Sequence, residues 1–155
     1  MTQDPTLSAT DQQAMVDLVR RAAAEHLTTD GPQAADRKAD GSWITTTDEA
    51  MQATLQTGLA DRFPTHGFLG EEMSIAEQES AWRACLDGRP TWVVDPLDGT
   101  SNFRVGFPVY SVTLALLVGG QTIFGVVFDP YRDECFHAAR DGGAWLNEER
   151  LSLQN

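Results

Sequence analysis

Apolar residues recur every three or four positions in three stretches of the N-terminal half, a spacing that predicts amphipathic helices. The first helix is expected to begin at Thr10, which forms a capping-box pattern with Gln13. Its apolar face comprises Met15, Leu18, Val19, Ala22 and Leu27. A second capping-box pattern near Thr46–Glu49 opens a helix whose apolar face comprises Met51, Leu55, Leu59 and Phe63. A third helix is predicted from Ile75 to Leu86, and the polar segment Gly31 to Gly41 between the first two helices is predicted to be a mobile loop.

After the third helix the pattern changes to short runs of apolar and β-branched residues, which indicate strands. Thr91 to Val94 is predicted to be an interior strand that stops at Pro96, because proline cannot donate to a ladder. Further strands are predicted at Val109–Val118 and Thr122–Asp129 around a Gly119-Gly120 hairpin turn, then at Glu134–Ala139 and Ala144–Leu146. Helices followed by an antiparallel meander predict an α+β fold, and with no internal repeat or linker, residues 1–155 are expected to form one domain.

Composition narrows the function classes without naming one. The chain has 155 residues, a formal net charge of −12 and a pI near 4.4. This acidity argues against binding to a nucleic-acid backbone or to an anionic membrane. The N-terminus lacks a signal-peptide pattern and no apolar run is long enough to span a bilayer, so a cytoplasmic protein is expected. Cys85 and Cys135 are expected to be reduced and structural.

The candidate chemistry is concentrated in Asp95-Pro96-Leu97-Asp98-Gly99-Thr100. Two carboxylates three positions apart would lie together at the end of a buried strand, where hard oxygen ligands suit Mg²⁺. Gly99 allows the backbone to approach a ligand closely, and the amides of Gly99 and Thr100 would open a helical turn that favours an anion. Asp98-Gly99 is also an ordinary turn dipeptide. The segment therefore predicts either a metal and phosphate site or a simple turn.

Other segments favour the metal and phosphate site. Phe68-Leu69-Gly70-Glu71-Glu72 is another short apolar run that ends in carboxylates, and Lys38, Asp40 and Thr47-Asp48 form a polar segment that enters a helix. With Gly70-Glu71-Glu72 and Asp95 to Phe103 in this order, the chain resembles the N-terminal half of an inositol monophosphatase family enzyme. That family comprises Mg²⁺-dependent, lithium-sensitive phosphatases. The resemblance extends to Gly142 to Asn147 and implies helices on one face of the sheet, without the family's C-terminal α/β domain.

The resemblance also implies roles for individual residues. Glu71, Asp95 and the Leu97 carbonyl would ligate one Mg²⁺, and Asp95 with Asp98 would begin a second metal site. Asp98, together with the Gly99 and Thr100 amides, would border the substrate phosphate.

Thr100 paired with Asp48 would activate the attacking water, although an acidic residue in a first helical turn is also favoured by the helix dipole alone. Glu72 would be an outer group of the metal site. Lys38 would balance the local negative charge or would simply be solvated.

The resemblance thus implies a Mg²⁺-dependent phosphomonoesterase that acts on a small phosphate ester such as myo-inositol 1-phosphate, in a family that tends to form homodimers. One departure leaves an alternative open. The family has a further aspartate, in a Trp-Asp-x-Ala-Ala-Gly motif, that has no counterpart up to Asn155. The chain would then be a catalytically incompetent half that binds metal and phosphate or pairs with another chain, and it would expose an apolar surface where the second domain packs.

Overall fold

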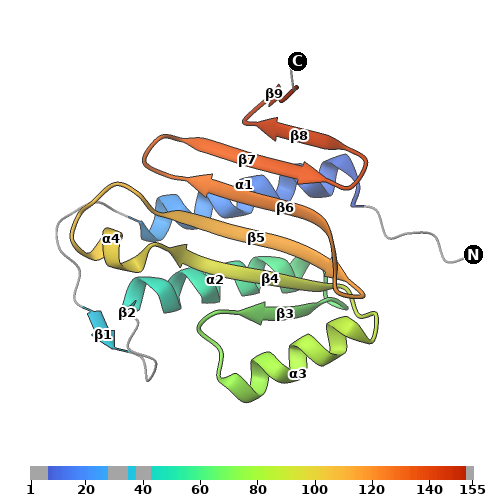
Figure 1. Ribbon diagram of the computed structural model, residues 1–155, viewed down its shortest axis with the longest axis horizontal. Coiled ribbons are helices and arrows are strands. Elements are labelled where there is room, and N and C mark those ends of the chain that lie inside the picture. The colour runs from blue at the N-terminus through green and yellow to red at the C-terminus, as the bar shows by residue number, and fades with distance from the viewer. Residues whose placement is uncertain (1–6, 28–34, 38–42, 153–155) are drawn as a thin grey trace, which may run out of the picture.

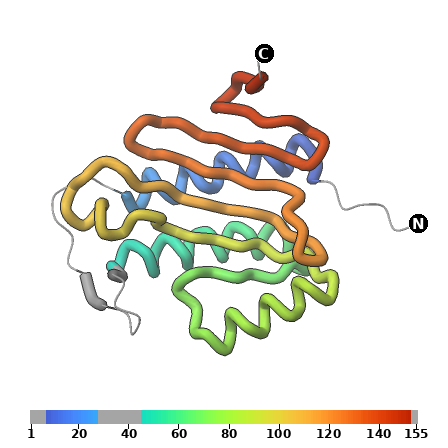
Figure 2. Tube along the Cα trace, in the orientation of Figure 1, coloured from blue at the N-terminus to red at the C-terminus, as the bar shows by residue number. Residues whose placement is uncertain are grey.

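A seven-stranded sheet forms one layer of the fold in the computed structural model, which describes residues 7–27, 35–37 and 43–152. The strands lie side by side in the order in which they occur along the chain (Figure 2). They are β3 (Gly67–Gly70), β4 (Thr91–Asp98), β5 (Ser111–Val118), β6 (Gln121–Asp129), β7 (Glu134–Ala139), β8 (Gly143–Leu146) and β9 (Glu149–Arg150). A separate antiparallel pair consists of β1 (Ala35–Arg37) and β2 (Trp43–Thr45).

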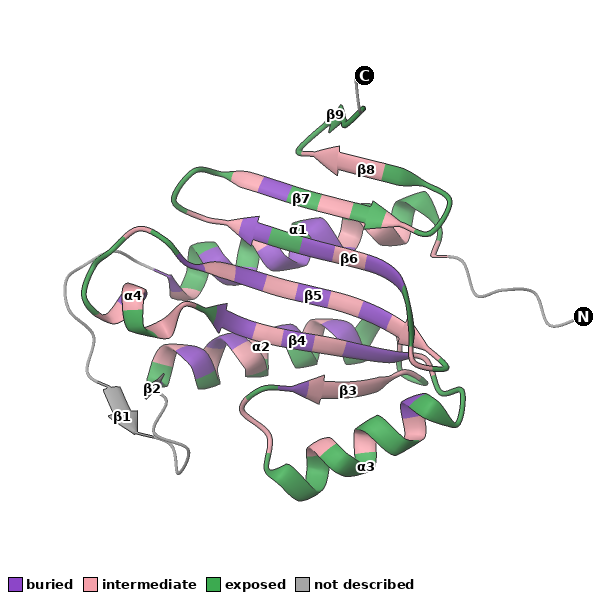
Figure 3. Ribbon diagram, in the orientation of Figure 1, coloured by how far each residue is buried: buried purple, intermediate pink, exposed green. Residues whose placement is uncertain are grey.

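Two long helices, α1 (Ala9–His26) and α2 (Thr46–Arg62), cover one face of this sheet (Figure 1). Helix α3 (Ile75–Leu86) lies beside the edge strand β3, and the short helix α4 (Thr100–Arg104) follows β4. The core lies between α1, α2 and the sheet, and its most deeply buried side chains include Val19, Met51, Leu55, Trp92, Leu114 and Phe124. Residues on β5 alternate between buried and partly exposed positions (Figure 3), as expected when helices cover one face only. The α+β fold is confirmed.

The three predicted helices are present. Helix α2 begins at Thr46 as predicted and α1 begins one residue earlier than expected, but the caps of both differ from the prediction. Helix α1 is capped by Ser8, which accepts a hydrogen bond from the Asp11 amide at 3.1 Å, and not by Thr10. Helix α2 is capped by Thr45 in a capping box with Asp48, and not at Thr46–Glu49. In both helices an aspartate occupies the position where glutamate or glutamine is usual in a capping box. The sequence pattern therefore placed the two capping residues one or two positions too late.

The sheet departs from the predicted meander at its β3 edge. Strand β3 pairs parallel with β4, whereas all neighbouring pairs from β4 to β9 are antiparallel as expected. Strand β4 does not stop at Pro96: pairing resumes at Asp98 after a register shift that follows Asp95. Proline is tolerated there because a bulge leaves it outside the ladder.

Smaller elements also differ from expectation. Strand β5 begins at Ser111 and not at Val109, and β9 was not anticipated. Strand β1 lies within the segment expected to be a loop. The β5–β6 hairpin is confirmed, because Gly119 and Gly120 have φ values of 57° and 74°, the left-handed pair that a tight hairpin turn requires.

Cys85 and Cys135 are buried free thiols, which confirms their predicted state. Within the described ranges, no helix combines the length and apolar character needed to cross a bilayer.

The second face of the sheet is left without a helix by the described residues (Figure 1). Paired residues across adjacent strands share a face, so Val127, Phe136 and Leu146 form one row on this side, and Gly125, Ala138 and Ala144 form the next. Val127 is 44% exposed and Phe136 is 40% exposed, which are high exposed fractions for large apolar residues in a strand. The apolar surface expected for this domain is therefore present, and we call these two rows the open face.

Candidate active site

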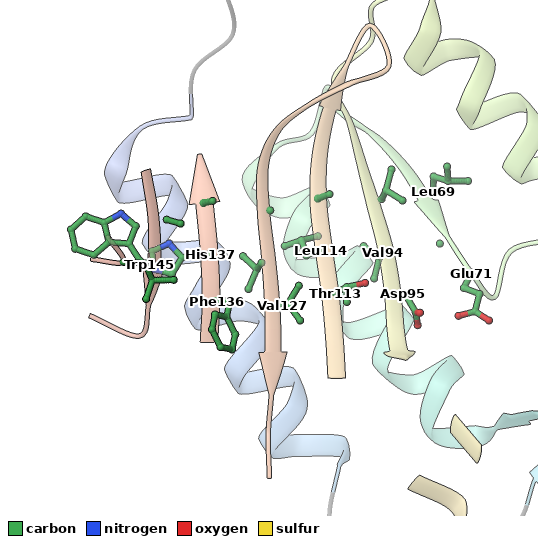
Figure 4. Close-up of a pocket in the computed structure, with 18 of the residues that line it drawn as sticks. Leu69, Glu71, Val94, Asp95, Thr113, Leu114, Val127, Phe136, His137 and Trp145 are labelled. Carbon is green, nitrogen blue, oxygen red and sulfur yellow. The ribbon is translucent and has the colours of Figure 1, made fainter. Parts of the chain in front are cut away.

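The parallel pairing of β3 and β4 brings two carboxylates together at one edge of the molecule. Gly70 lies opposite Val94, and the Glu71 amide continues the ladder by donating to the Val94 carbonyl at 3.1 Å. The next residue of each strand is acidic, so Glu71 and Asp95 become neighbours. Figure 4 shows both carboxylates at the carboxyl end of their strands, at the end of a groove of about 760 Å³ that runs along the open face.

Asp95 is half-buried, and its environment disfavours the ionised form. Burial, followed by a hydrogen bond with Glu71 and the charges of Glu71 and Asp98, raises the pKa of Asp95 from 3.8 to about 7. One hydrogen bond acts in the opposite direction, because the Leu97 amide donates to Asp95 Oδ1 at 3.1 Å. The charged groups that shift this pKa are all carboxylates. A proton relieves their repulsion in the metal-free protein, and a cation would relieve it equally.

Asp48 uses its two carboxylate oxygens for different purposes. The side chain is only 1% exposed. Oδ2 accepts the Thr45 amide at 2.7 Å and the Thr45 hydroxyl at 2.5 Å, which completes the capping box of α2. Oδ1 accepts the Thr100 hydroxyl at 2.9 Å. The predicted Asp48–Thr100 pair is thus formed, and the role of Asp48 at the start of the helix is satisfied by the other oxygen.

Thr100 joins this pair to the segment that follows Asp95. Its hydroxyl also lies 3.0 Å from the Leu97 carbonyl, and a single proton can serve only one of the two acceptors at a time. The Leu97 side chain is 1% exposed and anchors the segment in the core. The Leu97 carbonyl is thereby held next to Thr100 and close to Asp95.

Gly99 is required where β4 turns into α4. Its φ of 94° lies in the left-handed region, and a Cβ atom there would lie 2.9 Å from the Val109 carbonyl oxygen. The same oxygen accepts a hydrogen bond from Asn102 Nδ2 at 2.7 Å, which ties the following loop against the turn. The backbone at Gly99 and Thr100 is therefore fixed, and it forms the beginning of α4 as predicted.

The other predicted residues lie at the margins of this arrangement. Asp98 is the exposed last residue of β4, paired with Ser111, and it acts on Asp95 through its charge. The Glu72 amide donates to Gln52 Oε1 at 2.8 Å. Lys38 lies outside the described residues. Among the residues that are described, no three His, Cys, Asp or Glu side chains are gathered closely enough to hold a metal ion. Glu71 and Asp95 are the carboxylates that neighbouring strands bring together, and we take this pair as the centre of the candidate site.

A family comparison bears directly on this geometry, because the model of the inositol monophosphatase family matches residues 4–155. The chain belongs to the inositol monophosphatase family. Among curated relatives, it is 42% identical over 113 residues to the quinic acid degradation cluster protein x of Neurospora crassa. It is 39% identical over 112 residues to inositol monophosphatase 1 of Solanum lycopersicum. These matches cover 71% and 72% of the chain, but only 33% and 40% of the relatives.

Solved structures of the inositol monophosphatase family agree with the fold. The Thermotoga maritima enzyme superposes on 90% of this chain with a TM-score of 0.77 at 26% identity, and the match spans 52% of that protein. An IMPase/NADP phosphatase complexed with Mg²⁺ and phosphate matches 89% of the chain and 48% of its own length, with a TM-score of 0.67 at 24% identity. The chain therefore spans about half the length of these solved structures.

The donor set fits a hard divalent cation. The available ligands are the carboxylates of Glu71 and Asp95 and the carbonyl of Leu97, which are hard oxygen donors of the kind that Mg²⁺ prefers. The neighbouring strand positions of Glu71 and Asp95 are the observation that tests this fit, because they place both carboxylates where one cation could contact them.

Sequence analysis missed two glutamines that contact the Glu71 segment. Gln52 accepts from Glu72, as described above, and Gln78 Nε2 donates to the Glu71 carbonyl at 2.9 Å. The only available signal for Gln52 was its position one helical turn after Asp48, on the same side of α2.

Proposed function

We propose that the chain forms the metal-binding and phosphate-binding part of a Mg²⁺-dependent phosphomonoesterase of the inositol monophosphatase type. Its substrate would be a small phosphate ester such as myo-inositol 1-phosphate. The observation that carries this proposal is the convergence of the Asp48–Thr100 hydrogen bond with the Glu71–Asp95 pair, through the single segment that runs from Asp95 to Thr100. The relatives named above support the reaction class.

The residues divide the proposed reaction between them. Glu71, Asp95 and the Leu97 carbonyl would hold Mg²⁺, which when bound would stabilise negative charge on the phosphate and make a water molecule more acidic. Thr100 can donate its proton to Asp48 Oδ1 and still has oxygen lone pairs with which to accept a hydrogen bond from a water. Asp48, held by Thr45, is then the proton acceptor at the end of this relay. Asp98 and the amides of Gly99 and Thr100 would border the phosphate.

A second candidate function follows from the small number of side chains at the site. The described residues do not gather three His, Cys, Asp or Glu side chains closely enough to hold a metal ion. The chain would then bind metal and phosphate without efficient turnover. An assay of phosphate release from myo-inositol 1-phosphate in the presence of Mg²⁺ separates the two candidates.

Calorimetric titration with Mg²⁺ and Mn²⁺ tests the feature that both candidates share. Asp95→Asn should weaken divalent-ion binding strongly, and Asp98→Asn should chiefly affect a second, weaker site. Asp87→Asn is the matched control, because Asp87 is an exposed aspartate at the end of α3. Unchanged affinity in Asp95→Asn would refute the metal site, and with it the proposed function.

A further inference from the structure

The segment that carries Glu71 is held by side chains from two different helices. On one side, Gln52 of α2 accepts the Glu72 amide at 2.8 Å. On the other side, Gln78 of α3 places Nε2 at 2.9 Å from the Glu71 carbonyl and at 3.1 Å from the Met73 carbonyl. The same nitrogen lies 3.3 Å from the Gly70 carbonyl, so the two hydrogens of the Gln78 amide are shared among three carbonyls. Gln52 and Gln78 thus bind the N–H and the carbonyl of the Glu71–Glu72 peptide itself.

Gly70 leaves room for the Gln52 side chain next to this segment. A Cβ atom on Gly70 would lie 2.2 Å from Gln52 Oε1 and 2.6 Å from its Cδ, far inside van der Waals contact. Gly70 does not have a positive φ, so its backbone conformation does not call for glycine. The absence of a side chain at Gly70 instead leaves the space through which Gln52 reaches the Glu72 amide.

These hydrogen bonds hold the Glu71 segment in place against the repulsion between two neighbouring carboxylates. Glu71 is exposed on a short connection, and it must stay beside Asp95 although two carboxylates repel each other. The hydrogen bond from the Glu71 amide to Val94 sets the register, but it does not by itself prevent the connection from swinging away from the sheet. The bonds to the Gly70 carbonyl and to the Glu71–Glu72 peptide hold the connection against α2 and α3.

We infer that Gln52 and Gln78 are positioning residues that hold the Glu71 carboxylate beside Asp95. Helix α2 thereby aligns the segment that carries Glu71 with Asp48. The inference deepens the proposed function and rests on it for the role of Glu71. Gln52 lies one helical turn after Asp48, so a single rigid helix sets the place of both functional segments.

Mn²⁺ calorimetry on three variants provides the test. Gln52→Met keeps the length of the side chain but removes the acceptor, and it should weaken Mn²⁺ binding roughly tenfold, the scale of one hydrogen bond. Gln52→Glu keeps an acceptor oxygen and should bind Mn²⁺ at least as well as the wild type. Gln56→Met, at the exposed position one turn further along α2, should bind as the wild type does. Equal affinities for Gln52→Met and Gln56→Met would overturn the inference.

Hydrogen exchange in the metal-free protein separates this inference from the proposed function. Gln52→Met and Gln78→Met should each speed exchange of the Glu71 amide, which is bonded to Val94 and not to either glutamine. Gln56→Met should leave its exchange unchanged. A wild-type chain that binds no Mn²⁺ would refute the proposed function, whereas an unchanged Glu71 exchange rate in Gln52→Met would refute the positioning role itself.

Discussion

Replacing Asp95 with asparagine should stabilise the metal-free protein at neutral pH, even though it removes a proposed metal ligand. Asparagine keeps an oxygen for the Leu97 amide and can donate to Glu71, so both hydrogen bonds of Asp95 have a substitute. What it removes is the cost of ionising a half-buried carboxyl group next to two others. Residues that serve function at the expense of stability commonly show this behaviour.

The magnitude follows from the pKa of Asp95, which rises from 3.8 to about 7 on folding. Each step of one in pKa corresponds to about 1.4 kcal/mol, so the ceiling is about 4 kcal/mol. Asp95 is only partly buried, and solvent screening reduces the expected gain to about 1–2 kcal/mol. Below pH 3.8 the carboxyl is protonated in both states and the variant should match the wild type. As pH rises from 3.8 to about 7, the wild type should progressively lose stability relative to Asp95→Asn, and the full difference should persist above about 7.

Urea unfolding monitored by tryptophan fluorescence, with EDTA present, measures this difference at acidic and alkaline pH. Mg²⁺ should then reverse the order, because a ligand at one hundred times its dissociation constant adds about 2.7 kcal/mol to the protein that binds it. Asp87→Asn serves again as the control and should follow the wild type. If metal-free Asp95→Asn were no more stable than the wild type at pH 8, the carboxylate repulsion inferred from the structure would be wrong.

Three further predictions concern the Asp48–Thr100 pair and the open face. The two kinetic predictions apply to a protein in which this chain is joined to the second half of a solved relative. Asp48→Asn should lower the rate of phosphate release by roughly a hundredfold or more. The control Glu77→Gln, which changes the matching capping box of α3, should leave this rate unchanged. Similar losses in both variants would assign Asp48 to helix capping alone. Thr100→Val should also lower kcat by roughly a hundredfold while urea unfolding shows a loss of no more than about 2 kcal/mol, and an unchanged rate would remove the hydroxyl from the mechanism. Phe136→Gln should reduce self-association of the isolated chain, measured by light scattering. The control Tyr131→Gln changes an aromatic residue that is 61% exposed but does not belong to the open face, and it should not reduce self-association. Equal effects of the two variants would argue against association through the open face.

Local patterns predicted the elements whose signals are contained within a few residues. Helix α3 has the predicted bounds, because a serine cap precedes it and a glycine with a left-handed φ follows it at Gly88. The β5–β6 hairpin was equally clear from Gly119-Gly120. The direction of β3 could not be predicted in this way, since a run of four residues does not specify whether its partner strand runs parallel or antiparallel.

The candidate site was predicted mainly through the family resemblance. Asp48 and Thr100 are separated by 52 positions, so no periodicity could show that they meet. Gln52 and Gln78 were missed for a different reason: they bind backbone atoms of another segment, and a glutamine that does this looks in the sequence like any polar residue on a helix. The hydrogen bond that Gln52 accepts from the Glu72 amide becomes visible only in the structure.

The parallel pairing of β3 with β4 also has a consequence for the order of folding. The β5–β6 hairpin closes through a two-residue turn, whereas β3 can join β4 only after the chain has passed through α3 and returned. Closing the longer connection costs more chain entropy, so we expect β3 to dock late. Glu71 then reaches Asp95 only when the sheet is nearly complete, and an ion that binds both should slow unfolding without speeding folding. A bound cation would therefore stabilise the folded domain against unfolding and would not nucleate its folding.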